Sequence, residues 1–305
     1  MRLRCFSERR RRVAECLVGL IGGTGMGEAL TQGARGEKVT VDTPFGKPSC
    51  PILLTEVGGQ KVAVLARHGL AHEFNPAQVP YRANIFALKQ LGVTHILASG
   101  ATGSLQEHIA PRDLVVCDQT IDRTLRPGRT FFDEFVAHVE FSQPFCGQLR
   151  QVIIEAGKGL ATKVHAKGTY VCMEGPQFST RAESLMHRQI GGDLVGMTAM
   201  PEAKLAREAE ICYALIGIPT DYDCWRPHEP GRSADAVLES ILANMAAGTA
   251  GAIELIKRAV PRIAKAATPD CPCRSALAKA IWTQRPAIPA KAVERLAPLV
   301  AKYLE

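Results

Sequence analysis

Short apolar runs rich in β-branched residues alternate with longer amphipathic stretches through most of this chain of 305 residues. The short runs are typical of buried strands, and the longer stretches have the spacing of helices. The expected strands are Leu17–Ile21, Lys61–Ala66, Thr94–Ser99, Leu114–Asp118, Thr169–Met173, Leu194–Met197 and Tyr213–Ile218. The expected helices are Asn84–Leu91, Gln148–Ala156, Thr180–Gln189, Pro201–Cys212 and Ala234–Val260. This alternation predicts an α/β fold, with helices covering a central sheet.

Positive charge is concentrated at the N-terminus. The chain carries a net charge of +7, and residues 1–12 supply +5 of it with six arginines and one glutamate. The remainder is close to neutral, which does not indicate a nucleic-acid-binding face. We expect residues 1–16 to be a disordered tail and residues 17–265 to form one domain. No uninterrupted apolar stretch of about 18 residues is present, so we expect no membrane span.

The last part of the chain, residues 266–305, is expected to be a helical extension of that domain. A linker, Ala266–Pro272, precedes two amphipathic stretches, Ala276–Trp282 and Lys291–Tyr303. Pro298 is placed to kink or break the second of them. The extension is expected to pack on the body of the protein or on a neighbouring subunit.

The ten cysteines are scattered, and none forms the C-x-x-C pair of a zinc site. A chain of this size does not need a disulfide framework, so free thiols and a cytoplasmic location are expected. The one close pair is Cys271 and Cys273. Two reduced surface thiols are the favoured interpretation, with a strained redox pair or a bridge within an assembly as alternatives. No metal is expected.

Residues suited to binding a ligand follow five of the expected strands. They are the glycine loop Gly22–Gly25, the pair Arg67–His68, a small-residue turn over Ser99–Ser104, Thr198 beside a helix start, and the stretch Thr220–Trp225. Glycine amides, an arginine fork and a hydroxyl at a helix N-terminus all suit an anion. In an open α/β sheet, ligands bind outside the carboxyl ends of the strands. A dinucleotide loop is the alternative for the glycines, although its spacing is only loosely present.

Asp221 and Asp223 form a carboxylate pair beyond the strand Tyr213–Ile218. Alternation along an extended chain would point both side chains the same way. Such a pair can accept hydrogen bonds from an amino-substituted ring, and one member can carry a proton. The alternative is a strand-end turn with two solvated carboxylates.

Two apolar residues near these strand ends have competing interpretations. Phe178 can stack on a heteroaromatic ring or fill the core as a staple before the helix that Thr180 and Glu183 cap. Met197 can lie against a sugar or in the core.

The order and spacing of several motifs resemble the S-methyl-5′-thioadenosine phosphorylases, a branch of the trimeric purine nucleoside phosphorylase family. The motifs are Gly22–Gly25, Ala66–Gly69 with Gln78–Asn84 behind it, Glu174–Ser179, Gly196–Glu202 and Thr220–Trp225. The resemblance covers about residues 17–260. It implies one α/β domain around a distorted mixed sheet, a homotrimer, and phosphorolysis of S-methyl-5′-thioadenosine to adenine and 5-methylthioribose 1-phosphate in purine and methionine salvage. Inorganic phosphate would be the co-substrate, with no cofactor and with no nucleic-acid or membrane partner.

The resemblance also implies roles for individual residues. Phosphate ligands would be Thr24, Arg67, His68, Gly100, Ala101 and Thr198. Substrate contacts would be Phe178, Ser179, Met197, Asp221, Tyr222, Asp223, Ala234, Val237 and Leu238, with His138 offered by a neighbouring subunit near the 5′ end. Many relatives have a hydroxyl residue where this chain has Gly100, so one side-chain donor to phosphate is missing. Ala234 stands where valine is common, which would widen the 5′-thiomethyl pocket.

The chemistry of the carboxylate pair favours an aminopurine. We expect Asp221 to protonate purine N7 and Asp223 to accept from the 6-amino group, because a 6-oxo group would need the NH₂ of an asparagine. The alternatives are a phosphorylase for 6-oxopurine nucleosides, a hydrolase that uses water, and a non-catalytic nucleotide sensor or dehydrogenase-like module.

Overall fold

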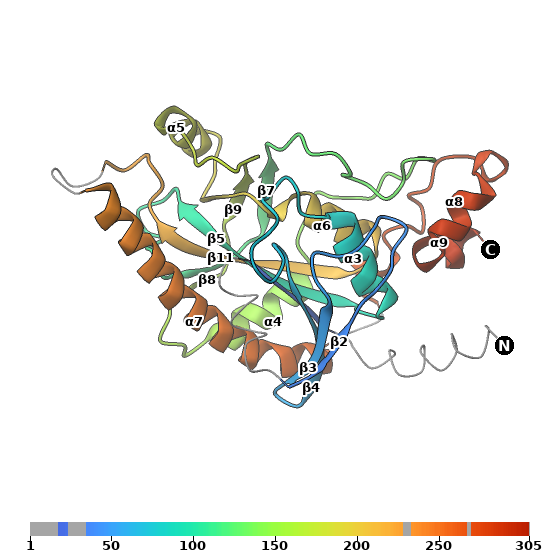
Figure 1. Ribbon diagram of the computed structural model, residues 1–305, viewed down its shortest axis with the longest axis horizontal. Helices are drawn as coiled ribbons and strands as arrows, with labels where there is room; N and C mark the ends of the chain where they lie inside the picture. Colours follow the sequence, from blue (N-terminus) through green and yellow to red (C-terminus); the bar gives the residue numbers. More distant parts are fainter. Residues whose placement is uncertain (1–17, 24–34, 228–232, 267–269, 305) are drawn as a thin grey trace.

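The computed structural model describes residues 18–23, 35–227, 233–266 and 270–304 (Figure 1). The expected basic tail, residues 1–16, and the predicted phosphate ligand Thr24 lie outside the described residues.

A mixed sheet of eleven described strands forms the centre of the fold. Its main path runs β2-β3-β4-β1-β5-β10-β9-β7, while β11 pairs with β5 and β6, and β6 pairs with β8. The strands are β1 (Val18–Gly22), β2 (Glu37–Val39), β3 (Ile52–Val57), β4 (Gln60–Ala66), β5 (His95–Ser104), β6 (Leu114–Val116), β7 (Gln119–Asp122), β8 (Val164–His165), β9 (Thr169–Cys172), β10 (Leu194–Gly196) and β11 (Cys212–Asp221). Strands β4, β1, β5 and β11 are parallel neighbours, so their carboxyl ends meet at one edge.

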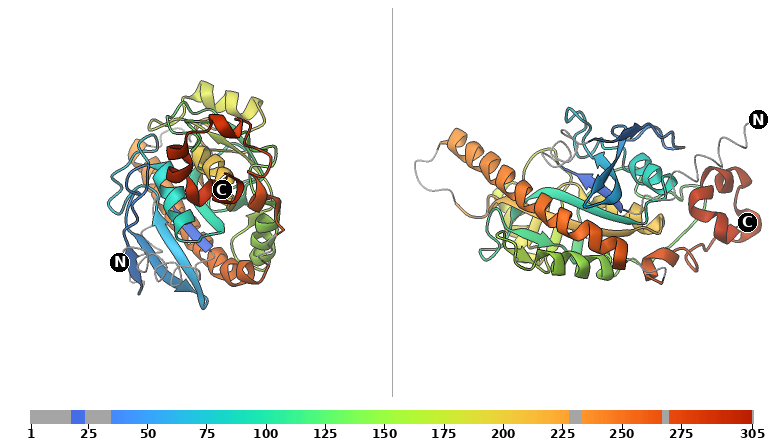
Figure 2. Two further views of the ribbon diagram at one scale, coloured as in Figure 1. Left: turned by 90° about the vertical axis from the view of Figure 1, so that its right-hand side faces the viewer. Right: turned by 90° about the horizontal axis from the view of Figure 1, so that it is seen from below.

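Helices cover both faces of this sheet. They are α3 (Tyr81–Gln90), α4 (Gly147–Gly157), α5 (Arg181–Gln189), α6 (Ala199–Glu208), α7 (Ala234–Ala266), α8 (Ala290–Arg295) and α9 (Ala297–Leu304), with short 3₁₀ helices η1 (Pro272–Ser275) and η2 (Arg285–Ala287). One core cluster joins α4 and α7 to the sheet, and another joins α3, α6 and the C-terminal extension. Figure 2 shows α4 and α7 side by side.

All seven expected strands and all five expected helices of the domain are present, but several ends differ. β5 continues to Ser104 and α7 to Ala266, while α6 ends at Glu208, so that Cys212 belongs to β11. Four strands were not expected: β2, β3, β7 and β8. The last of these has only two residues, and β2 has three, so neither offers enough length for a periodic pattern.

The C-terminal extension agrees with the expectation in its second stretch and differs in its first. The second stretch is broken into α8 and α9, with Pro298 in the first turn of α9. The first stretch, Ala276–Trp282, is wrong as a helix, because its backbone bonds to the body of the protein instead. Leu277 N donates to a Glu210 carboxylate oxygen at 3.0 Å, and Trp282 N donates to Val136 O at 3.0 Å.

Helix α7 is long and apolar enough, by length and composition alone, to pass for a membrane span over Asp235–Ile263. Packing accounts for its apolar C-terminal half, where Ala252, Leu255, Ile256 and Ala259 are buried against the sheet. Its N-terminal half extends beyond the sheet at the opposite end of the molecule from α8 and α9 (Figure 1).

Candidate active site at the ends of strands β1, β4, β5 and β11

A gap in the sheet beside β5 marks the candidate site. On one edge of β5, β1 pairs with His95–Ala98 and β10 pairs only with Gly103 and Ser104. The described strands therefore leave Ser99–Thr102 without a ladder partner on this edge. The predicted turn over Ser99–Ser104 is wrong, because β11 pairs along the other edge and keeps β5 extended.

Gly23 lies at this gap. A Cβ atom added to Gly23 would lie 3.1 Å from Arg67 Nη1 and 3.1 Å from Ser99 O, so a larger residue would require these neighbours to shift by a few tenths of an ångström. A Cβ atom on Gly100 would lie 3.5 Å from Thr198 Oγ1. The structure thus brings the ends of β1 and β4, the middle of β5 and the start of α6 together, as the strand-end argument predicted.

Arg67 is fully buried and held by a partner that sequence reasoning missed. Its Nε and Nη2 donate to the two Glu202 carboxylate oxygens, each at 2.7 Å, and Nη1 donates to Ser99 O at 2.9 Å. Burial alone lowers the pKa of Arg67, but Glu202 raises it above its ordinary value. These bonds use three of the five guanidinium N–H groups. The guanidinium is therefore fixed in place with N–H groups left for an anion.

His68 is buried beside Arg67. Its Nδ1 lies 2.8 Å from Phe74 O, and since a carbonyl only accepts, Nδ1 carries the hydrogen. Burial and the Arg67 charge lower the pKa of His68 to about 4, so the ring is neutral at pH 7. Its Nε2 is then an acceptor, which suits the P–OH group of a monoprotonated phosphate.

Thr198 occupies the N-cap position of α6, but its hydroxyl makes no capping bond to the helix. Its backbone N donates to Tyr170 Oη at 3.3 Å. The backbone is non-helical at Met200, so the regular turns of α6 begin after that residue and not at Thr198. The uncommitted Thr198 hydroxyl can still donate to an anion. Met197, the preceding residue, is half-buried. Its Sδ packs closely on Gly175, so that a Cβ atom added to Gly175 would lie 2.6 Å from it.

The carboxylate pair forms by a different local geometry from the one predicted. β11 ends at Asp221, and Asp223 N donates to Asp221 Oδ2 at 2.9 Å, which makes an Asx turn. Asp223 has a φ of +47°, in the left-handed region. Extended alternation is therefore wrong here, although the turn still keeps the two residues together.

The two carboxylates differ in their hydrogen bonds. Asp221 Oδ1 accepts from Thr220 Oγ1 at 2.8 Å, in addition to the bond from Asp223 N. Asp223 Oδ2 is buried and has no hydrogen-bond partner among the described residues. Because a buried polar atom without a partner costs free energy, Asp223 Oδ2 is the acceptor that a ligand would satisfy.

Other predicted base contacts lie around this turn. Ser179 O accepts from Cys224 Sγ at 3.2 Å, which joins the segment before α5 to the Asx turn. Phe178 is 85% exposed, so the core-staple interpretation is wrong. Tyr222 directs its hydroxyl to Glu107 O at 3.3 Å. The capping box of α5, Thr180 with Glu183, is confirmed.

Helix α7 reaches the same strand end. Asn244, which the sequence did not single out, donates from Nδ2 to Thr220 O at 2.7 Å. Val237 and Leu238 lie about two helical turns before it, half-buried and 56% exposed respectively. The side chain of Ala234 is outside the described part of the chain.

His138 lies against the C-terminal extension. Its backbone N donates to Ala280 O at 2.8 Å, and its ring contacts Trp282 edge-on, with ring centroids 4.8 Å apart. This position leaves open the expected contact with a neighbouring subunit.

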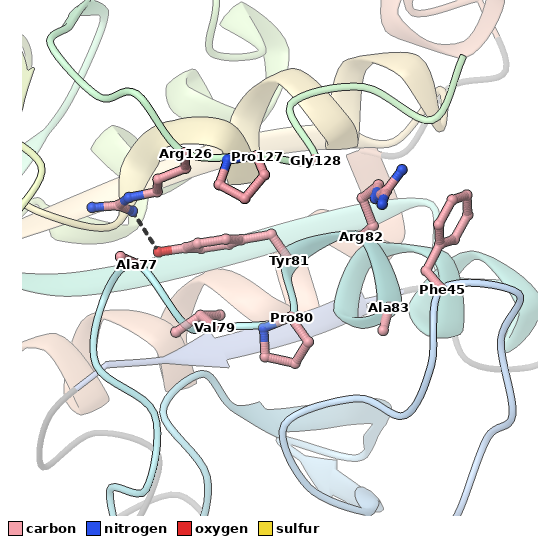
Figure 3. A pocket seen from close by; sticks show the side chains of 10 residues that line it. All are labelled: Phe45, Ala77, Val79, Pro80, Tyr81, Arg82, Ala83, Arg126, Pro127 and Gly128. Carbon is pink, nitrogen blue, oxygen red and sulfur yellow. Dashed lines mark hydrogen bonds between the residues drawn. The ribbon is translucent and has the colours of Figure 1, made fainter. Parts of the chain in front are cut away.

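A cavity of about 170 Å³ lies elsewhere, beside α3 (Figure 3). Its lining residues are Phe45, Ala77, Val79, Pro80, Tyr81, Arg82, Ala83, Arg126, Pro127 and Gly128. None of them is a predicted site residue. Arg126 donates to Tyr81 Oη at 2.9 Å and to Met200 O at 3.0 Å, so this cavity wall supports the start of α6.

Comparison with known proteins identifies the family of this chain. The sequence profile of the Phosphorylase superfamily matches residues 17–260. The S-methyl-5′-thioadenosine phosphorylase of Gloeobacter violaceus is 43% identical over 94% of this chain and 95% of its own length. A methylthioadenosine phosphorylase structure from an Antarctic soil metagenomic library has a TM-score of 0.85 and 44% identity, covering 94% of this chain and 99% of its own. The methylthioadenosine phosphorylase of Schistosoma mansoni in complex with adenine has a TM-score of 0.77 and 38% identity, covering 86% of this chain and 96% of its own. The chain therefore belongs to the phosphorylase superfamily and, within it, to the S-methyl-5′-thioadenosine phosphorylase family of pentosyltransferases.

Proposed function

We propose that this enzyme cleaves S-methyl-5′-thioadenosine with inorganic phosphate, giving adenine and 5-methylthioribose 1-phosphate, and that it serves purine and methionine salvage in the cytoplasm. The observation that carries the proposal is the buried Asp223 Oδ2, an acceptor without a partner among the described residues, at the same sheet edge as Arg67. The relatives' names and the adenine bound in the Schistosoma mansoni structure support the same substrate class.

The gap beside β5 is the proposed phosphate site. Arg67 offers its remaining N–H groups, and Thr198 offers its hydroxyl. His68 Nε2 accepts from the phosphate hydroxyl. Gly100 gives no side-chain donor, so we propose that the backbone of Gly100 and Ala101 replaces it. Phosphate held here stabilises the cation-like sugar that forms as the glycosidic bond breaks, and then bonds to it.

We propose that Asp223 recognises the 6-amino group of the base. A 6-amino group donates, and Asp223 Oδ2 accepts. Pairing would satisfy an atom that is otherwise buried without a partner. A 6-oxo group in the same place would set one acceptor against another, which is the basis of discrimination. Ser179, held to the same turn through Cys224, and the exposed ring of Phe178 complete the proposed base contacts.

We propose that Asp221 is the general acid for purine N7, and that its hydrogen bond with Thr220 controls the proton transfer. Thr220 Oγ1 donates to Asp221 Oδ1 at 2.8 Å and also lies 3.3 Å from Thr102 O. When the hydroxyl turns its hydrogen to that carbonyl, the bond from Thr220 to Asp221 is lost, and the protonated Asp221 carboxyl passes its proton to the leaving base.

We further propose a homotrimer. Leu125, Phe178, Leu238 and Leu242 are large apolar side chains exposed in the single chain. Exposed apolar groups of this size are typical of interfaces. A neighbouring subunit would cover them and bring its His138 to the 5′ end. Light scattering after size exclusion should give three times the chain mass of 32.9 kDa, and a monomeric mass would refute the trimer.

One incubation tests the reaction. The protein is mixed with S-methyl-5′-thioadenosine, with and without phosphate, and the products are identified by chromatography and mass spectrometry. We expect adenine and 5-methylthioribose 1-phosphate only when phosphate is present. Free 5-methylthioribose, formed at the same rate without phosphate, would show a hydrolase instead. Faster turnover of 5′-methylthioinosine would show a 6-oxopurine enzyme.

A further inference from the structure

Four cysteines that are far apart in the sequence meet in one buried cluster: Cys146, Cys212, Cys271 and Cys273. Their sulfur atoms all lie within 4.8 Å of one another. Cys271 and Cys273 are only 3% and 6% exposed, so the interpretation as surface thiols is wrong. The scattered spacing in sequence hid this cluster, because its members come from three separate segments.

Each segment is held by regular structure. Cys146 is the N-cap residue of α4, Cys212 is the first residue of β11, and Cys271 and Cys273 flank the first residue of η1. A backbone bond joins two of these elements, since Cys146 N donates to Tyr213 O at 2.8 Å. Cys271 is fixed at the start of η1, where its carbonyl accepts from Arg274 N at 2.8 Å.

The sulfur separations match four ligands around one ion. Cys271 Sγ lies 3.6 Å from Cys146 Sγ and 3.4 Å from Cys212 Sγ. A tetrahedron with metal–sulfur distances of about 2.3 Å has sulfur–sulfur edges of about 3.8 Å. Covalent sulfur–sulfur bonds are far shorter, at about 2.0 Å. The sulfur atoms are therefore not bonded to one another, and their separations are near those of ligands that share one ion.

Cys146 lies where a thiolate is stabilised, at the start of α4. The backbone N of Leu149, in the first turn of α4, donates to Cys146 Sγ at 3.5 Å. Amide donors of this kind and a helix N-terminus stabilise a thiolate.

We propose that these four cysteines bind one Zn²⁺ in a closed structural site. Binding converts four thiols to thiolates and releases their protons to solvent, with no change in oxidation state. Four sulfur ligands leave no open position for a substrate, so the ion has no part in the reaction. It would instead anchor the C-terminal extension, through Cys271 and Cys273, to the first residue of β11 and the start of α4. The proposal is independent of the proposed substrate.

The full chain should be produced with zinc in the medium, purified under reducing conditions, and analysed for metal by elemental mass spectrometry. We expect one zinc per chain, and after replacement by Co²⁺ the visible absorption of a tetrahedral cobalt thiolate centre. Cys146→Ser should lose the metal while keeping a good helix cap, since serine is a preferred N-cap residue. The double variant C271S/C273S should lose it too. Cys50→Ser, a buried cysteine outside the cluster, should retain it.

Three results would overturn the proposal. The first is wild-type protein with four titratable cluster thiols and no zinc after exposure to it. The second is bridged cysteines in alkylation and mass analysis without reductant, together with no metal. The third is one zinc per chain remaining in folded C271S/C273S. Should the variants fail to fold, the wild-type cobalt spectrum decides, because octahedral or absent absorption contradicts a tetrathiolate site.

Discussion

Replacing Asp223 by asparagine should change which purine the enzyme accepts. The substitution keeps size, and asparagine tolerates the φ of +47° found here. It also keeps the backbone N–H that closes the Asx turn on Asp221. The change therefore removes the negative charge and one acceptor while the local fold is retained.

The magnitude follows from the buried state of Asp223 Oδ2. A hydrogen bond to a charged group contributes about 1.5–3 kcal/mol, which is about 10- to 150-fold in rate. We expect kcat/KM for S-methyl-5′-thioadenosine to fall by that factor in Asp223→Asn. The new NH₂ group can donate to a 6-oxo oxygen, so kcat/KM for 5′-methylthioinosine should rise.

The assay is phosphate-dependent release of each base, with both nucleosides measured in the wild type, in Asp223→Asn and in Asp42→Asn as an exposed matched control. The thermal midpoint of each variant shows that folding is unaffected. We compare the ratio of the two kcat/KM values in folded Asp223→Asn with the wild-type ratio. A difference of less than about threefold would refute the proposal that Asp223 recognises the 6-substituent of the base.

Three further predictions concern the anion site and its neighbours. Glu202→Gln leaves the Arg67 guanidinium buried without its carboxylate partner, so we expect the free energy of unfolding in urea to fall by about 3–5 kcal/mol. A loss under about 1 kcal/mol would contradict a stabilising role of the Arg67–Glu202 ion pair. Gly23→Ala places a Cβ 3.1 Å from Ser99 O and 3.1 Å from Arg67 Nη1. We therefore expect the KM for phosphate to rise more than the KM for the nucleoside. Equal rises of the two KM values would contradict a phosphate site at this position. Burial lowers the pKa of His68 and of His95 from 6.5 to about 4, so the unfolded chain binds protons first on acidification. Stability should then fall between these values, by up to about 1.4 kcal/mol per pH unit for each histidine, and His68→Asn should flatten the slope.

Local patterns were enough for the framework of the domain. Apolar runs such as Lys61–Ala66 and Tyr213–Ile218 predict strands because burial on both faces leaves a continuous apolar signature in the sequence itself. The cap formed by Thr180 and Glu183 involves residues three apart, so it too is readable along the chain. Parallel strands end at one edge, which is why Gly23 and Arg67 could be placed together before the fold was known. Thr198 reaches them by another path, because it follows β10, which is antiparallel to β5.

Only the tertiary structure decided the features that depend on partners distant along the chain. Arg67 is aligned by Glu202, which lies 135 residues away, and β5 stays extended through Thr102 because β11 supports it. The backbone of Ala276–Trp282 leaves the helical pattern that its side chains suggest, since Glu210 and Val136 satisfy it from outside. The four-cysteine cluster has no signature in sequence spacing for the same reason. The periodicity of a sequence indicates which face of a helix or strand is buried. Which distant residue packs against that face depends on the path of the whole chain.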